Sequence, residues 1–169
     1  MSNKIILTVF CIFLSVMYFA EIAHSFETVD ECYKKLVRKF PSVEAIKAEF
    51  GDRAIWEERT EPSPHDNNLI LRITYMSYPG IEISTMGYTW EGKDSFFITS
   101  LNVYKAGIVN FSGIDIGSAR ISVIRKFGRP VSNKNNELRY EDDTTGDMSI
   151  TFIIEIDKVV EIRFTSYPD

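Results

Sequence analysis

Residues 113–130, Gly-Ile-Asp-Ile-Gly-Ser-Ala-Arg-Ile-Ser-Val-Ile-Arg-Lys-Phe-Gly-Arg-Pro, decide the fold because they contain a complete helix with both of its ends. The hydroxyl of Ser118 is expected to cap the first turn. Gly128 can adopt the left-handed conformation that ends a helix, and the proline two residues later prevents it from resuming. Apolar side chains between these ends recur at helical spacing and predict one buried face, formed by Ile121, Val123, Ile124 and Phe127.

Length and composition describe a folded protein with one domain or two small subdomains. The chain has 169 residues, of which 44% are hydrophobic and 25% are charged, as in ordinary globular proteins. The net charge is -5, and no run of lysine or arginine exceeds two residues. Nucleic acid is therefore not an expected partner, since binding to phosphates needs clustered cations.

The first 25 residues have the features of a secretory signal peptide. Lys4 gives a positive start, residues 5–19 form an apolar segment, and Ala-His-Ser at 23–25 has the small residues of a cleavage site. The apolar segment is shorter than the roughly 20 residues that span a membrane, so we expect cleavage rather than an uncleaved anchor. The mature protein would then begin at Phe26, in the periplasm or outside the cell, with no stable membrane anchor.

The first half of the mature chain is predicted to form two helices followed by strands. Thr28 and Glu31 have the spacing of a capping box, which opens a helix that Pro41 ends. Ser42 is placed to cap a second helix over residues 43–50. Alternation of apolar and polar residues predicts strands at 54–60, 69–76, 81–84 and 97–103. In the last of these we expect four side chains on one face, those of Phe97, Thr99, Leu101 and Val103.

The second half repeats this order after its helix at 118–127. Strands are expected at 138–141, 148–156 and 160–165. An acidic turn over residues 142–147 joins the first two, and a tight turn at Asp157-Lys158 joins the last two. The result is a three-stranded meander packed by one helix.

An internal repeat is indicated by the order of these patterns. Alignment of the Phe-Gly pair at 50–51 with the Phe-Gly pair at 127–128 brings the two short helices into correspondence, and residues 100–103 then align with 161–164. The identities are few, and any α+β protein could show helix-then-strands twice.

We therefore predict an α+β fold of two tandem units, each with a helix on an antiparallel sheet, and the helices on one face of that sheet. The units are expected at 26–111 and 112–169, after a signal peptide at 1–25.

The stretch that decides the fold is similar to the signature of the SmpA/OmlA-type outer-membrane assembly lipoproteins and the β-lactamase inhibitor proteins. That signature is an apolar-x-apolar-Gly start, a capped helix, and an apolar residue with Gly-x-Pro. It is carried here by Ile114, Ile116, Gly117, Val123, Phe127, Gly128 and Pro130. The paired strands on either side of Asp157-Lys158 also resemble those of the family. The resemblance covers the C-terminal third of the chain well and the first half loosely.

This resemblance implies an envelope or secreted location and a function in binding another protein, through envelope assembly or inhibition of a secreted enzyme. Two departures limit what carries over. The residues before Cys11 do not form a lipoprotein cleavage box. The mature chain keeps only Cys32, so the disulfides of the inhibitors are absent and their target does not carry over. Cys32 itself is expected to be a buried, small apolar residue.

Catalytic and metal-binding groups are scarce in the mature sequence. His65 is its only histidine, which argues against a His-based triad or a multi-His metal site. The acidic turn at 141–147 is the best metal candidate, but its spacing matches no calcium loop, and Asp and Gly are common in hairpin turns. We therefore expect no catalytic residue, no metal and no cofactor.

Aromatic side chains of the first half remain as candidates for a binding site, since such residues are the usual anchors of protein interfaces. The candidates are Trp56, Tyr75, Tyr88 and Trp90. Burial in the core is the competing interpretation for each of them. The sequence thus predicts a non-catalytic module that binds another protein, and it leaves the oligomeric state open.

Two alternative functions have distinct structural requirements. A module that binds a small ligand or a cell-wall fragment would use a groove between sheet and helices, marked by a large apolar pocket with convergent polar groups, and a filled core would oppose it. A carboxylate-based hydrolase would need two Asp or Glu side chains roughly 5–10 Å apart in a cleft.

The signal peptide gives the first testable prediction. Mass spectrometry of the protein purified from the extracytoplasmic fraction of its host should give the mass of residues 26–169, because cleavage is expected after Ser25. A cytosolic protein that still carries residues 1–25 would contradict the prediction.

Overall fold

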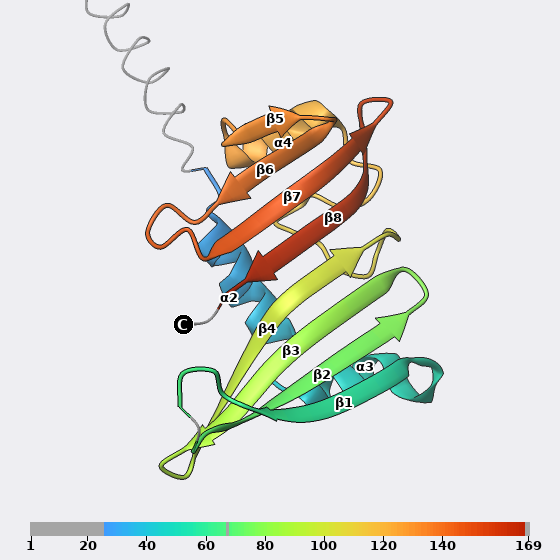
Figure 1. Ribbon diagram of the computed structural model, residues 1–169. Helices are drawn as coiled ribbons and strands as arrows, with labels where there is room; N and C mark the ends of the chain where they lie inside the picture. The colour runs from blue at the N-terminus through green and yellow to red at the C-terminus, as the bar shows by residue number, and fades with distance from the viewer. Residues whose placement is uncertain (1–25, 67, 168–169) are drawn as a thin grey trace, which may run out of the picture.

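The computed structural model describes residues 26–66 and 68–167, so the predicted signal peptide lies outside the described residues. The described chain combines three α-helices with one eight-stranded antiparallel sheet, whose strand order is β1-β2-β3-β4-β8-β7-β6-β5 (Figure 1). This architecture confirms the predicted α+β class. Among the described helices, none has the length and apolar character needed to cross a membrane.

In each half of the described chain, helices come first and strands follow, as predicted. The helices are α2 (Val29–Lys39), α3 (Val43–Phe50) and α4 (Arg120–Phe127), and a single turn of 3-10 helix, η1 (Gly51–Arg53), follows α3. The strands are β1 (Ile55–Pro62), β2 (Ile70–Tyr78), β3 (Ile81–Trp90), β4 (Lys93–Val103), β5 (Ser132–Lys134), β6 (Glu137–Glu141), β7 (Met148–Glu155) and β8 (Lys158–Ser166).

Local capping chemistry defines the ends of α2 and α3. The Thr28 hydroxyl accepts a hydrogen bond from the Glu31 N–H at 3.2 Å, and the Glu31 carboxylate accepts one from the Thr28 N–H at 3.3 Å. The Ser42 hydroxyl caps α3 by accepting from the Ala45 N–H at 3.3 Å. Both predicted N-terminal caps are confirmed.

The helix α4 differs at its start from the prediction. It begins at Arg120, and its N-cap residue Ala119 makes no side-chain bond. The Ser118 hydroxyl accepts instead from the Asp115 N–H at 3.0 Å, so it stabilises the preceding turn and the predicted cap is wrong. The C-terminal prediction is confirmed, since Gly128 has a φ of 78° and donates to the Ile124 carbonyl at 2.8 Å.

The buried face of α4 is also narrower than predicted. Val123 and Phe127, four residues apart, are buried, whereas Ile121 is 52% exposed. A helix of about two turns touches the sheet along one stripe, and Ile121 lies well away from that stripe at 100° per residue. The expected burial of Ile121 is therefore wrong.

Aromatic contacts join each helix to the sheet. Tyr33 of α2 stacks on Phe164 of β8 with ring centroids 5.6 Å apart. Phe50 of α3 lies 5.3 Å from Tyr78 of β2, and Phe127 of α4 lies 5.2 Å from Phe152 of β7. In Figure 1 the strands lie in front of the helices. We term the sheet face that carries this buried core the core face.

A β-bulge in β4 decides which of its side chains enter the core. Residues 84 and 85 of β3 pair with residues 100 and 98 of β4, so Thr99 is the additional residue. Ile98 and Leu101 consequently share the core face, where both are 0% exposed, and Phe97 turns to the opposite face. The prediction that Phe97, Thr99, Leu101 and Val103 share one face is wrong, because the bulge shifts the alternation by one residue.

Two details of the second half also differ from prediction. The tight turn is Ile156-Asp157, with φ of 48° and 58°, and Ile156 is 98% exposed instead of belonging to a strand. The predicted turn at Asp157-Lys158 is thus misplaced by one residue. The three-stranded meander gains a fourth strand, β5, whose residues Ser-Asn-Lys are short and polar and show no alternation.

Glu27 connects the start of the described chain to three parts of the fold. Its carboxylate accepts from Lys35 of α2 at 2.5 Å and from the Ser112 hydroxyl, and it lies 3.5 Å from the Lys126 ammonium of α4. The side chain is only 9% exposed. Burial alone would raise the pKa of Glu27, but the hydrogen bonds and the two lysine charges hold it below its ordinary value of 4.5.

We expect Glu27→Gln to lower the free energy of unfolding by about 1–2 kcal/mol near neutral pH, because hydrogen bonds to a charged group are lost. Since folding lowers the pKa, the contribution is present above the unfolded value of 4.5 and is lost as pH falls through the folded pKa. The difference between the two proteins should therefore shrink in acid, as measured by urea denaturation at several pH values.

Lys34→Gln is the matched control, since it removes the 2.6 Å ion pair between Lys34 and Asp30. The side chain of Lys34 is 61% exposed. An exposed pair of this kind contributes no more than about 0.5 kcal/mol. Equal destabilisation by the two substitutions would show that Glu27 is an ordinary surface group.

Candidate functional site

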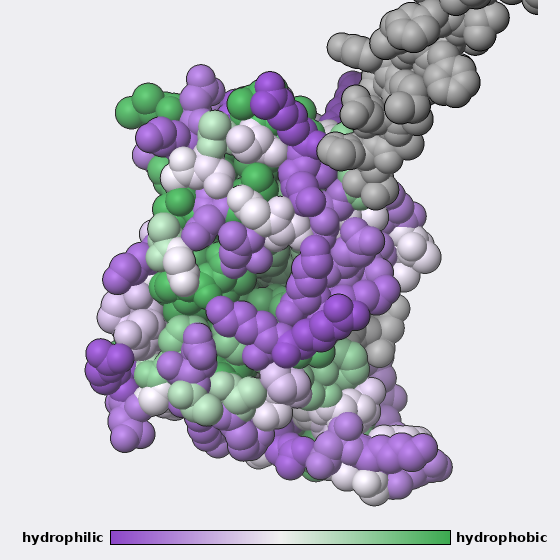
Figure 2. Space-filling model, turned by 180° about the vertical axis from the view of Figure 1, so that it is seen from behind, coloured by the Kyte–Doolittle hydropathy of each residue, from purple (hydrophilic) through white to green (hydrophobic). Residues whose placement is uncertain are grey.

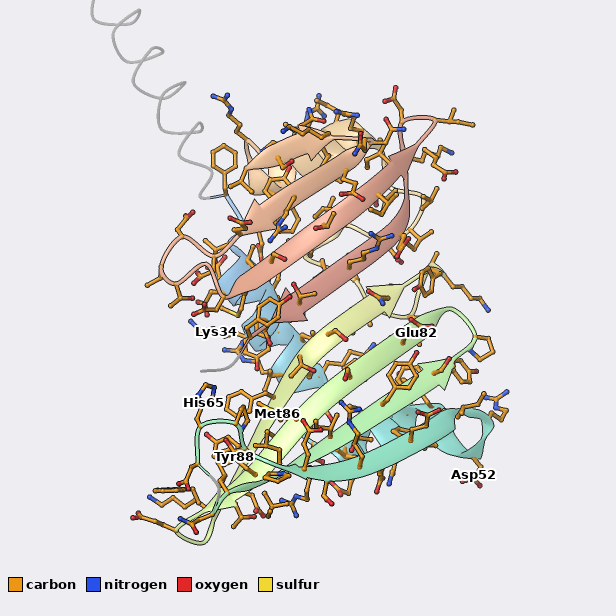
Figure 3. The ribbon with its side chains drawn as sticks, viewed as in Figure 1. Lys34, Asp52, His65, Glu82, Met86 and Tyr88 are labelled. Atoms are coloured by element: carbon orange, nitrogen blue, oxygen red, sulfur yellow. The ribbon has the colours of Figure 1, made fainter. Side chains whose placement is uncertain are left out.

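The second face of the sheet, termed the open face, lies opposite the core face and carries many polar and charged side chains. One row on it crosses all eight strands through paired residues, in the order Ile55, Ser77, Glu82, Asn102, Arg163, Thr151, Arg139 and Ser132. Figure 3 looks onto this face, with Glu82 labelled. On the opposite side of the molecule, Figure 2 shows hydrophobic residues gathered near the middle and hydrophilic residues around them.

Apolar and aromatic side chains gather on the open face of the first half, across β2, β3 and β4. Met86 is at the centre, because it pairs with Ile73 on β2 and with Phe97 on β4. Tyr88 and Trp90 follow Met86 at alternate positions of β3, and Tyr75 follows Ile73 on β2, so all point to the same face. We term this group the aromatic patch: Ile73, Tyr75, Met86, Tyr88, Trp90 and Phe97.

The aromatic patch is partly ordered by its own contacts. The rings of Tyr88 and Phe97 stack with centroids 5.9 Å apart and an interplanar angle of 25°. These residues are diagonal neighbours on β3 and β4, an arrangement that stabilises antiparallel pairs. Trp90, beside the β3–β4 turn, is 52% exposed, whereas Tyr75, Tyr88, Met86 and Phe97 are half-buried. A large apolar surface thus reaches solvent on a rigid three-stranded support.

Carboxylates border the aromatic patch at Tyr75. Glu82 accepts hydrogen bonds from the Tyr104 hydroxyl at 3.2 Å and from the Asn102 amide at 3.4 Å. Burial, together with the charges of Glu82 and Glu57, raises the pKa of Tyr75. Within residues 26–66 and 68–167, neither Glu57 nor Glu82 forms an ion pair. This edge of the patch is therefore acidic.

The structure brings together three of the four aromatic residues selected from the sequence. Tyr75, Tyr88 and Trp90 share the open face, whereas Trp56 pairs with Met76 and so lies on the core face. There Trp56 is half-buried against the core, and the Lys47 ammonium lies 5.5 Å from its ring centroid. Trp56 and Trp90 are thus not exposed on a common surface.

Three patch residues, Ile73, Met86 and Phe97, are not among the candidates predicted from the sequence. The adjacent phenylalanines at 96 and 97 gave a partial signal, because neighbours in a strand must point to opposite faces. Which of the two faces the core depends on the bulge at Thr99 and not on the local sequence.

The open face of the second half is polar and internally paired. Arg163 donates two hydrogen bonds to Glu161, at 2.6 and 3.1 Å, and lies 3.7 Å from Glu137. Arg139 lies 2.9 Å from Glu141. The aromatic patch therefore ends at the junction between β4 and β8.

Groups with potential for catalysis are used structurally or lie apart. Cys32 is buried, and this burial, with a smaller effect from Glu27, raises the pKa of its thiol to about 12. His65 is exposed in the β1–β2 loop. Asp142 in the acidic turn accepts bonds from the Thr145 N–H and hydroxyl at 3.0 and 2.9 Å. Across the described ranges, no three His, Cys, Asp or Glu side chains are grouped as metal ligands would be.

Comparisons of the chain with protein-family models, with curated proteins and with solved structures find no match. The interpretation of the site therefore depends on its geometry and chemistry.

Proposed function

We propose that this chain is a non-catalytic module, periplasmic or secreted, that binds another protein through the aromatic patch. The observation that carries the proposal is the exposure of Trp90, 52%, beside the stacked rings of Tyr88 and Phe97. Trp and Tyr are the residues most enriched at the centre of protein interfaces, where they bury large areas at a small cost in conformational entropy.

The composition of the surroundings supports a protein partner. Interfaces have an apolar centre and a polar rim, and here Glu57, Arg59 and Glu82 border the apolar group. The patch lies on paired strands, so little ordering would accompany binding. The partner is expected to present an apolar loop with a basic residue at its edge, opposite the unpaired carboxylates.

We also propose that the fold consists of two tandem units, with the helices of both on one face of the sheet. Two observations on the short helices support it. Gly51 and Gly128 both follow eight-residue helices, with φ of 63° and 78°, and donate to the carbonyls of Lys47 and Ile124. Aromatic residues just before these glycines, Phe50 and Phe127, both contact a tyrosine of the sheet.

The central strand pair supports the same proposal. Residues 100–103 and 161–164, which the repeat aligns, are neighbours in the sheet, with Leu101 opposite Phe164 and Val103 opposite Ile162. The bulge residues Thr99 and Val160 correspond in this alignment. The shared position of the bulge favours duplication over a chance succession of similar elements.

The relation to the assembly lipoproteins and β-lactamase inhibitor proteins remains part of this proposal. It is supported by the helix α4 with its glycine end and by the β7–β8 hairpin, which are the segments that resemble the family. Assembly of an envelope complex and inhibition of a secreted enzyme are the two functions that this relation suggests.

The partner-binding role predicts that Trp90→Ala weakens the complex roughly thirtyfold or more, because central tryptophans contribute most of the binding energy of an interface. The measurement is affinity capture from the native extracytoplasmic fraction, followed by calorimetric titration with the captured protein. Tyr75→Ala should weaken binding in the same direction.

Ile121→Ala is the matched control, since Ile121 is also 52% exposed but lies on α4, away from the open face. It should leave the affinity unchanged. Equal loss with both variants, or a captured protein that binds Trp90→Ala as tightly as the original chain, would refute the role of the patch.

A further inference from the structure

A groove on the core face lies beside the N-terminus of α3, apart from the aromatic patch. The helix α3 has 8 residues and is about 12 Å long, whereas the 10-residue strand β3 extends about 33 Å. In Figure 1 β1–β4 run on beyond α3. The uncovered part forms a groove of about 650 Å³, within the range of ligand sites.

The strand positions that line this groove change from apolar to polar. Farther along the core face, Met76 and Ile83 pair with each other and are 1% exposed. In the groove the corresponding pair is Thr74 and Thr85, and Arg72 pairs with Gly87. The backbone φ of Gly87 is not in the left-handed region, so the conformation does not demand glycine there. The missing side chain leaves the floor of the groove open.

Two threonines present hydroxyl groups on the floor of the groove. Thr74 is 8% exposed and Thr85 is 3% exposed, and both line the groove. The side-chain hydrogen bonds found within residues 26–66 and 68–167 include none from either hydroxyl, while neighbouring side chains are bonded to one another. Among the described residues no fully buried side-chain oxygen or nitrogen lacks a hydrogen-bond partner, so these two hydroxyls reach the groove, where water or a ligand can bond to them.

The walls of the groove carry charges of both signs in pairs. Arg72 lies 3.3 Å from Asp94, which also accepts from the Thr89 hydroxyl at 2.6 Å. Lys47 lies 2.7 Å from Glu58 on the other wall. The side chains that face the groove thus include two cations, Lys47 and Arg72, and three carboxylates, Glu44, Glu58 and Asp94. An anionic ligand would meet more repulsion than attraction, whereas a neutral ligand with many donors and acceptors can bond to both signs.

We propose that this groove binds a neutral oligosaccharide of two or three sugar units. Sugar hydroxyls donate to the carboxylates and accept from the guanidinium and ammonium groups. They can also bond to the hydroxyls of Thr74 and Thr85, which are accessible from the groove. The half-buried ring of Phe96, in the groove lining, provides apolar surface for the C–H face of a sugar ring.

Binding without hydrolysis agrees with the carboxyl groups of the groove. The backbone N–H and the Ser42 hydroxyl lower the pKa of Glu44, and the hydrogen bond from Thr89 followed by the charge of Arg72 lowers that of Asp94. A general acid for glycoside cleavage needs a raised pKa instead.

The test is calorimetric titration of the full mature chain with maltotriose, cellotriose and triacetylchitotriose, and with tri-galacturonic acid as the anionic comparison. We expect saturable binding of at least one neutral trisaccharide. The double variant Thr74→Val/Thr85→Val should weaken it roughly tenfold or more, since two hydrogen bonds are lost. Its thermal unfolding midpoint should not fall, because valine has nearly the shape of threonine and the hydroxyls that it replaces face the groove.

Thr151→Val on β7 and Trp90→Ala on the open face are the controls, and neither should change saccharide binding. Binding of none of the neutral trisaccharides, or of the anionic one alone, would overturn the proposal. Undiminished binding to the double variant would overturn the site, and release of reducing ends during titration would overturn the assignment as a binding site without hydrolysis.

Discussion

The pairing of β4 with β8 is the contact on which the rest of the sheet depends. It comprises four residue pairs, from Ser100–Thr165 to Val103–Ile162, and it alone joins β1–β4 to β5–β8 within the sheet. The core-face residues of this junction, Leu101 and Phe164 among them, are 0% exposed. Tyr33 of α2 stacks on Phe164 and closes the junction from the core side. The burial of these apolar side chains offsets the conformational entropy that the chain loses when strands distant in the sequence are brought together.

The bulge next to this junction sets the chemistry of both faces of the first half. Because Thr99 is inserted into β4, Phe96 faces the groove and Phe97 faces the aromatic patch. Without the inserted residue, Phe97 would lie on the same face as Leu101 and Val103, and Phe96 would lie on the opposite face. One additional backbone residue therefore positions an aromatic ring in each of the two surfaces for which we propose binding.

The difference in length between helices and strands accounts for the groove beside α3, the second of the two surfaces for which we propose binding. A helix rises 1.5 Å per residue and a strand about 3.3 Å, so a helix of eight residues leaves part of the neighbouring strands uncovered. The chain places threonines and paired charges on that part, as it must if the strip remains in water. In the second half the charges instead lie on the open face, where Arg163 and Arg139 are paired with glutamates.

The sequence by itself determined most of the helix ends and most of the strands. Thr28 with Glu31, Ser42 and Gly128 act on backbone groups three or four residues away, so a short window contains the whole interaction. The same locality explains why the sequence predicted, in each half, a short helix followed by a glycine and strands. Three of the four aromatic candidates belonged to one surface because strand alternation is also local.

Only the tertiary structure decided the role of Ser118, the burial of Trp56, the inclusion of β5 and the face of Phe97. The Ser118 hydroxyl bonds to the turn before α4, and Trp56 points to the core because of its pairing with Met76. The strand β5 has no apolar alternation and exists through its pairing with β6. The faces of Trp56 and Phe97 and the existence of β5 are fixed by a partner strand or by a bulge that reverses the alternation. A single-residue shift in register exchanges the faces of a strand without changing its sequence pattern.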